Sequence, residues 1–210
     1  CTLRDAVVKA GENTNASLIS FDSSVTTVTL TQSSVTFPVG KTIIIQGHKD
    51  NKTTIERSPP NQFRIFAVGN NSSDPNSTIV SFQNLNITNG HLSSGNGGAI
   101  LVTKATVNIT DSNIYDNTTQ SNGGGVNAYD ATVNISGSTI ANNNVNIHGG
   151  GVYVHTSTVN ITGSTINNNT ANRNGGGVNA YQGTMNITDS TIYDNTAQQR
   201  GGGVYAYDAT

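Results

Sequence analysis

The sequence is poor in charged, aromatic and sulfur-containing residues, and it contains no tryptophan. Only 10% of its 210 residues are charged and the formal net charge is −2, which excludes the basic surface that binds nucleic acid or anionic membranes. The single cysteine, Cys1, excludes an intrachain disulfide. A buried structural thiol is the favoured interpretation of Cys1, and a lipid-modified terminus is the alternative. No apolar run reaches the roughly 18–20 residues of a membrane-spanning helix, and no secretory signal segment opens the chain.

Hydrophobic residues are also scarce, at 33% of the chain. Asn, Thr, Ser and Gly take their place, yet these polar residues alternate with Val and Ile instead of forming tracts. Disorder is therefore not expected. The composition indicates a fold that satisfies small polar side chains by stacking them.

A repeat of 26 residues dominates the second half, where segment 123–144 aligns without a gap with segment 149–170. A single period of this length is typical of solenoids, propellers and other arrays. The apolar positions that recur at this spacing are Ile100, Val126, Val152, Val178 and Val204; Ile109, Ile135, Ile161 and Ile187; and Ile114, Ile140, Ile166 and Ile192.

Each repeat contains three short runs with an alternating apolar pattern, which predict three short strands. Three strands are too few for a propeller blade, but they suit one coil of a parallel β-helix in which each strand pairs with its copy about 4.8 Å along the axis. The GGG triplets then mark bends where no Cβ fits. A recurring asparagine closes the third strand, and we expect it to point inward and bond backbone amides at the corner. This inward set is Asn117, Asn143, Asn169 and Asn195.

The first 96 residues are less regular. Segment 3–10 places apolar residues on one helical face and ends at Gly11, which predicts a short helix that caps the first coil. Strands are expected within 18–25, 28–37, 41–47 and 63–69, with projecting loops at 56–62 and 69–77. Phe82 and Ile87 align with Ile109 and Ile114 at an offset of 27. We expect one domain, 1–210, with a cap and irregular coils over 1–96 and regular coils over 97–210 that continue beyond the last residue.

Several motifs resemble a known family. "GGAI" and "GGGV", followed by "IYDN", "IANN" and "INNN", are similar to the GGA(I/L/V) and FxxN repeats of the chlamydial polymorphic outer membrane proteins and of related secreted β-helix proteins. "CTLRDAV", "TIERS", "FRIFAV" and "LNITNG" resemble the amino-terminal part of such proteins, although Ile replaces Phe in the regular xxN elements. The resemblance implies an all-β, right-handed, single-stranded parallel β-helix at the cell surface or in a secreted chain.

No catalytic, metal or cofactor site is predicted. The candidate carboxylates of the regular coils do not stack in adjacent coils, so they form no ligand ladder of the kind that pectate-lyase-like enzymes need. The charged stretch 47–58 is interpreted as a solubilising turn rather than a projecting site. Histidine spacing does not suit a metal. The candidate carboxylates are Asp111, Asp116, Asp130, Asp189, Asp194 and Asp208.

Two outward columns are expected to reach solvent. One carries recurring Asn-Ile-Thr/Ser motifs, which are either side-chain ladders that stabilise the stack or N-glycosylation acceptors. The other is aromatic and either packs along its sheet or binds sugars or a protein. The candidate glycosylation residues are Asn86, Asn108, Asn134, Asn160 and Asn186, and the aromatic column contains Tyr129, His155, Tyr181 and Tyr207.

Three functions are compatible with these patterns. The first is an extracellular structural or adhesive rod that binds cell-surface glycans or proteins, or copies of itself end to end. The second is a polysaccharide-processing enzyme on the same scaffold. The third is an ice- or surface-binding module, suggested by the regular Thr-x-Asn-x-Thr face. The first is favoured because no cluster of acidic and basic residues falls in adjacent coils.

Overall fold

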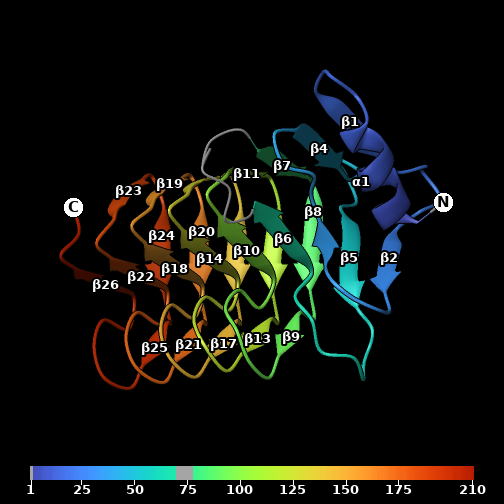
Figure 1. Ribbon diagram of the computed structural model, residues 1–210. Coiled ribbons are helices and arrows are strands. Elements are labelled where there is room, and N and C mark those ends of the chain that lie inside the picture. The colour runs from blue at the N-terminus through green and yellow to red at the C-terminus, as the bar shows by residue number, and fades with distance from the viewer. Residues whose placement is uncertain (1, 70–77) are drawn as a thin grey trace.

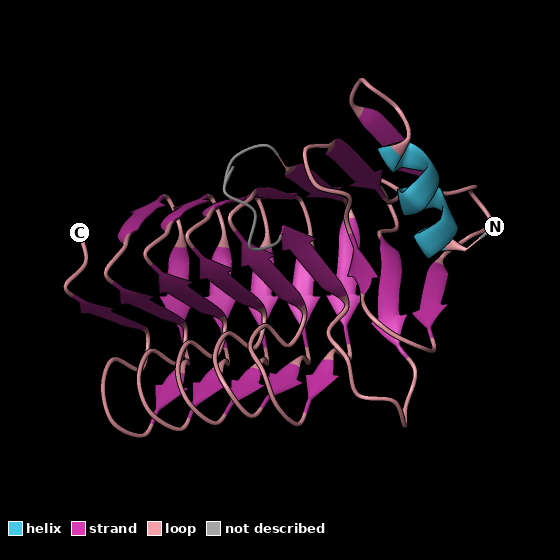
Figure 2. Cartoon of the chain, viewed as in Figure 1, coloured by secondary structure: helices cyan, strands magenta, loops and turns pink. Residues whose placement is uncertain are grey.

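The chain forms a parallel β-solenoid, in which the strands stack in rows along one axis (Figure 1, Figure 2). The computed structural model describes residues 2–69 and 78–210. Cys1 and most of the predicted loop 69–77 lie outside the described residues. One helix lies at the amino-terminal end of the stack, and the carboxyl terminus lies at the other end (Figure 1).

Within the described residues, three parallel sheets of seven strands each run along the solenoid. Sheet A contains β1 (Ser17–Ser20), β4 (Thr42–Gln46), β7 (Ile79–Gln83), β11 (Thr106–Thr110), β15 (Thr132–Ser136), β19 (Thr158–Thr162) and β23 (Thr184–Thr188). Sheet B contains β2 (Thr27–Leu30), β5 (Thr53–Arg57), β8 (Leu85–Thr88), β12 (Asn113–Tyr115), β16 (Thr139–Ala141), β20 (Thr165–Asn167) and β24 (Thr191–Tyr193). Sheet C contains β3 (Val35–Thr36), β6 (Phe66–Gly69), β10 (Ile100–Thr103), β14 (Val126–Tyr129), β18 (Val152–His155), β22 (Val178–Tyr181) and β26 (Val204–Tyr207).

A fourth sheet corrects the expectation of three strands per coil. Sheet D has five two-residue strands, which lie between sheets B and C in the chain. Each of these strands has a single inward residue, as at the buried Thr119 and Ala171, so it is too short to show an apolar alternation. They are β9 (His91–Leu92), β13 (Thr118–Thr119), β17 (Asn144–Val145), β21 (Thr170–Ala171) and β25 (Thr196–Ala197).

The strand registers confirm the 26-residue period. Val126 pairs with Val152, and Ile135 pairs with Ile161. The offset of 27 is also confirmed one coil earlier, where Phe82 lies beside Ile109. Every regular coil therefore repeats the same positions on the same sheet, and a residue's number modulo 26 fixes the face on which it lies.

The core is a narrow column of aliphatic side chains along the axis. In β15, Val133 and Ile135 are buried while their neighbours are half-exposed, as expected from the period-2 alternation of a strand. In the irregular coils near the amino terminus the core also contains aromatic rings: Phe37, Phe66 and Phe82 pack with ring centroids 4.5–5.9 Å apart.

The helix α1 (Leu3–Gly11) covers the first coil, as predicted. Leu3, Val7 and Ala10 are buried, and the helix packs against β1, β3 and β4. Its first turn is fixed by a capping box, in which the Thr2 hydroxyl accepts from the Asp5 amide and the Asp5 carboxylate accepts from the Thr2 amide. The helix thus covers the side of the first coil on which no preceding coil is stacked.

One expectation about the irregular half was wrong. The charged stretch 47–58 is not all turn, because its second part forms β5 within sheet B. Glu56 and Arg57 therefore lie on a strand, and the loop predicted from residue 56 begins after Arg57. Within this strand Ile55 is fully buried, and the two charged residues follow it at the end of the strand.

Candidate binding face

The recurring inward asparagines form a buried ladder at the corner between sheets B and D. Asn117, Asn143 and Asn169 are fully buried. The Asn143 Oδ1 accepts from the Asn117 backbone amide at 3.1 Å and from the Asn117 Nδ2 at 3.0 Å, and Asn169 serves Asn143 in the same way. Asn195 continues the ladder with only partial burial. These side chains satisfy amides that the corner leaves unpaired, so they build the coil and are closed to ligands.

A second ladder of this kind escaped the sequence analysis. The Ser138 hydroxyl oxygen accepts from the Ser112 amide at 3.1 Å, and it donates to the Ser136 carbonyl at 2.8 Å. Serine at this position is unremarkable in a chain so rich in serine, and only its 26-residue recurrence could have revealed it. The set is Ser112, Ser138, Ser164 and Ser190.

The candidate carboxylates all occupy turns with left-handed backbone geometry. Each of the six has a φ angle between 47° and 55°, a region that Asp, Asn and Gly tolerate best. The equivalent positions one coil away from Asp111 and Asp116 are Gly137 and Asn142, with φ angles of 55° and 56°. The turn conformation thus accounts for these aspartates. Among the described residues, no three His, Cys, Asp or Glu side chains are grouped so that they could hold a metal ion.

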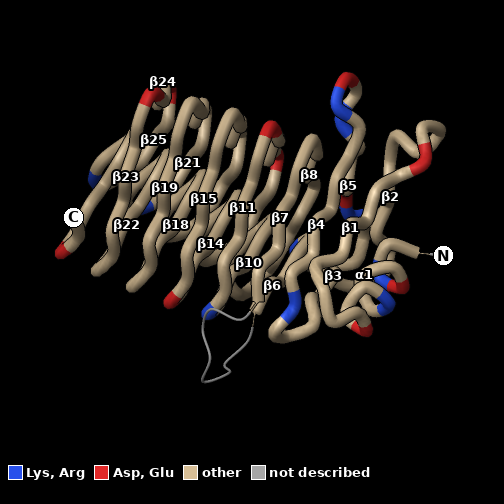
Figure 3. The backbone as a smooth tube through the Cα atoms, turned by 90° about the horizontal axis from the view of Figure 1, so that it is seen from above, with Lys and Arg blue, Asp and Glu red and all other residues tan. Residues whose placement is uncertain are grey.

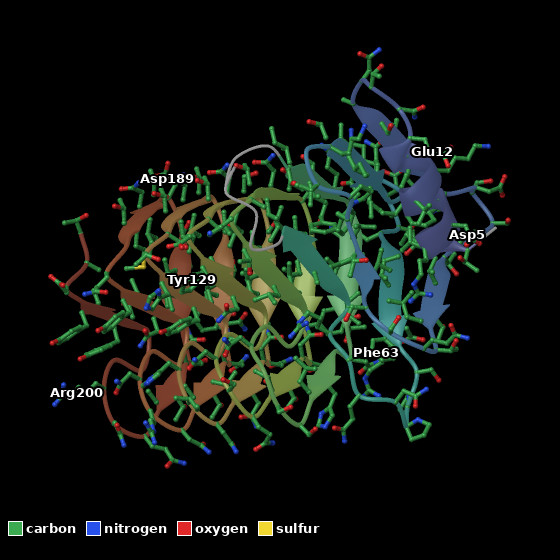
Figure 4. The ribbon with its side chains drawn as sticks, viewed as in Figure 1. Asp5, Glu12, Phe63, Tyr129, Asp189 and Arg200 are labelled. Atoms are coloured by element: carbon green, nitrogen blue, oxygen red, sulfur yellow. The ribbon has the colours of Figure 1, made fainter. Side chains whose placement is uncertain are left out.

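Charged residues occur mainly at the turns and near the amino-terminal end, and few of them lie on the strands of the regular coils (Figure 3). Asp189 and Arg200 illustrate this arrangement, because they project at different edges of the solenoid near its carboxyl-terminal end (Figure 4).

The outward asparagines of sheet A form their own ladder. The Asn134 Nδ2 donates to the Asn108 Oδ1 at 2.8 Å, and Asn160 and Asn186 extend the chain at 2.7 and 2.8 Å. The nitrogen that a glycan would modify is therefore already engaged in each of these contacts. Asn86 does not belong to this column: it lies on β8 in sheet B, beside Asn113.

The aromatic column on sheet C is a continuous stack. The Tyr129 and His155 ring centroids are 5.0 Å apart, His155 and Tyr181 are 5.2 Å apart, and Tyr181 and Tyr207 are 5.4 Å apart, with interplanar angles of 10–18°. Tyr129 is 44% exposed and Tyr207 is 53% exposed. Neighbouring rings cover one another's faces, so this column presents mainly ring edges and hydroxyl groups to solvent.

A second outward column on sheet C lies beside this stack and alternates in size. Asn127 and Asn179 are nearly buried, whereas the intervening Tyr153 and the following Tyr205 are larger and half-buried. Between this column and the aromatic stack lies a groove of about 340 Å³. Its lining is Tyr153, Asn179 and Tyr205, the stack residues His155, Tyr181 and Tyr207, and the corner residues His148 and Asn174.

The corner column alternates in step with the tyrosines. In the coil of Tyr153, the His148 ring stacks on the tyrosine with centroids 6.2 Å apart. In the coil of Tyr205, Arg200 donates to the tyrosine hydroxyl at 3.2 Å. The coil between them carries Asn174 at the corner. The last four strands of sheet C, from β14 to β26, therefore have a two-coil period imposed on the one-coil repeat of the backbone.

The lining of the groove contains no Asp, Glu, Lys or Arg side chain. Burial, with a contribution from Arg173, lowers the pKa of the His148 imidazole, and its Nδ1 accepts from the Asn174 amide at 3.3 Å. Burial and the neighbouring Tyr181 raise the pKa of the Tyr153 phenol, which keeps its proton. The groove can therefore offer phenol and amide hydrogen bonds beside aromatic surface.

Comparison of the chain with protein-family models, with curated proteins and with solved structures finds no significant match. Within the described residues, no helix is both long enough and apolar enough to span a bilayer. The site must accordingly be interpreted from its own geometry.

Proposed function

We propose that this chain is an extracellular structural and adhesive protein, a rod of stacked coils that binds surface glycans through the outer face of sheet C. The observation that carries the proposal is the aromatic groove. Its lining combines four tyrosines and two histidines with two asparagine side chains, and it contains no carboxylate. Clefts of this composition, apolar with a few placed polar groups, are typical of ligand sites.

The rod itself supports a mechanical role. Asparagine and serine ladders tie each coil to the next inside the solenoid, and a further asparagine ladder does so outside it. Each coil contacts mainly its neighbours, so length can be added without altering the binding face. Location at the cell surface is supported by the resemblance of the GGG and xxN elements to surface β-helix proteins.

An adhesion assay tests this proposal. The protein is attached to beads, and retention is measured on surfaces coated with plant, fungal or bacterial cell-wall polysaccharides. A variant with Tyr129, Tyr181 and Tyr207 replaced by threonine, the residue at position 103 of this column, is expected to lose retention.

The matched control replaces Asn134 by serine, the residue that Ser81 supplies in the outer column of sheet A. This control is expected to adhere like the unaltered protein. Absence of adhesion to every surface, or equal loss in both variants, would contradict a binding role for sheet C.

A further inference from the structure

The alternating column on sheet C places its tyrosines two coils apart. Tyr153 pairs in register with Asn179, and Asn179 pairs with Tyr205. Since neighbouring parallel strands lie about 4.8 Å apart, these two tyrosines are separated by about 9.6 Å along the axis. The backbone repeat gives no reason for such alternation, because every coil offers the same outward position.

The residues at the corner follow the same alternation. His148 stacks on Tyr153 and Arg200 bonds the hydroxyl of Tyr205, so both tyrosines are held toward the corner by a partner five residues earlier. The coil between them has Asn174 and Asn179 at the equivalent places. The result is a slot above Asn179, bounded along the axis by the two tyrosines and at its side by Tyr181.

Three buried side-chain atoms have no hydrogen-bond partner among the described residues: the Asn127 Nδ2, the Asn167 Oδ1 and the Asn174 Oδ1. Asn167 lies on sheet B, away from the groove. A buried polar atom without a partner costs about 1–3 kcal/mol. Asn174 lines the groove, but its Oδ1 is closed to solvent, so a ligand hydroxyl can reach this oxygen only if the Asn174 side chain turns outward.

We infer that the groove is a three-ring subsite for an extended β-1,4-linked polysaccharide that runs parallel to the solenoid axis. In such a polymer, alternate pyranose rings present the same face, and the length of one disaccharide is close to the separation of Tyr153 and Tyr205. The first and third rings contact these two tyrosines, and the middle ring lies above Asn179 with its hydroxyl groups near the Asn174 amide. This inference rests on the proposed function, whose ligand class it narrows.

The two-coil spacing of the tyrosines also distinguishes a β-1,4-linked chain from a helical polysaccharide. An α-1,4-linked chain curves, so its rings do not repeat one face at the two-coil spacing. A disaccharide of either linkage reaches only one of the two tyrosines. The groove is consequently expected to select both linkage and chain length.

Isothermal titration of the 210-residue protein with cello- and chito-oligosaccharides of two, three and six rings tests the inference. The trisaccharide of one series is expected to bind roughly tenfold more tightly than its disaccharide, because a second aromatic contact is added. The hexasaccharide should gain much less than another tenfold. Maltotriose should bind no better than a disaccharide.

Substitutions distinguish a loss of ligand binding at the subsite from a loss of folding. Tyr205→Ala should abolish the step between two and three rings, and Asn179→Tyr should fill the slot and prevent binding. Tyr153→Phe, which keeps the ring, should retain the step, as should Tyr193→Ala on the exposed face of sheet B. Thermal melting of each variant establishes that it is folded.

The outcomes distinguish the two proposals. Equal affinity for two and three rings, or equal binding of maltotriose, overturns this inference. If the protein adheres to polysaccharide surfaces but binds none of the β-1,4 oligosaccharides, the inference fails and the adhesive function stands. If it adheres to no surface, both fail.

Discussion

Replacement of Asn143 by alanine tests the inward ladder most sharply. The Asn143 side chain accepts from the Asn117 backbone amide and donates to the Ile114 carbonyl at 3.0 Å and to the Asn169 Oδ1 at 3.0 Å. The Asn117 Nδ2 keeps other partners after the substitution, because it also donates to the Tyr115 carbonyl. The Asn117 backbone amide loses its acceptor inside a region closed to water.

One buried amide without a partner costs about 1–3 kcal/mol. For a chain of this size, a loss of 2 kcal/mol corresponds to a fall in melting temperature of about 4–8 °C. The assay is thermal unfolding followed by circular dichroism in the β-sheet band. A chemical denaturation series measured in parallel gives the free energy of unfolding.

The control must be an asparagine that lies close by but points outward. Asn142 is exposed but has a φ angle of 56°, so alanine there adds left-handed strain of its own. Asn144 is exposed on β17, and Asn144→Ala should therefore change the melting temperature little. Equal destabilisation by Asn143→Ala and Asn144→Ala would refute the reasoning.

Three further predictions concern the pH response, the bends and the outer face. Since burial lowers the pKa of folded His148, the unfolded chain binds more protons than the folded chain below about pH 6.5, and the stability of the fold should decrease as the pH falls. His148→Asn introduces the residue that occupies the equivalent position 174, and this variant should show a smaller decrease in melting temperature between about pH 7 and 5. Gly150→Ala should unfold the coil, because the new Cβ would lie 2.4 Å from a carbonyl oxygen of the next coil. At Gly163 a Cβ would meet no atom within 4 Å, so Gly163→Ala should cost only about 1–2 kcal/mol of backbone strain. Similar melting temperatures for the two variants would contradict this prediction. Because the Asn134 Nδ2 is engaged in its ladder, peptide mass mapping of the natural protein should find Asn134 unmodified, and a glycan there would favour the coating explanation.

The solenoid itself was predictable because its signal is repeated and internal. Val133 and Ile135 must alternate with polar residues to fill a narrow core, and their copies fix the period and the register. The strands of sheet D were not predictable in the same way, because a strand of two residues has only one inward position and is too short to show an alternation. Likewise β5 was obscured by its charged last two residues, Glu56 and Arg57, which follow the buried Ile55.

The candidate site was predictable only in part. The stack that contains Tyr129 was recognised from the spacing, but its ring-to-ring packing required side-chain positions. The groove was missed although its signal is in the sequence: tyrosine occurs at 153 and 205, and asparagine at 127 and 179. A two-coil period is not recognised when each coil is aligned with the next, because a residue that changes from Asn to Tyr and back then looks like an unconserved position.

Two deletions of one coil each test the central claim that the recurring residues build the rod and the drifting residues bind. Removal of residues 97–122 preserves both the register and the groove, whereas removal of residues 149–174 preserves the register but takes away Tyr153, His155 and Asn174. The measurement is adhesion to the polysaccharide surface for which the unaltered protein shows the strongest retention, with thermal melting recorded for both proteins. The account predicts that both deletion proteins melt cooperatively and that only the first one adheres. Adhesion by both, or by the second alone, would contradict it.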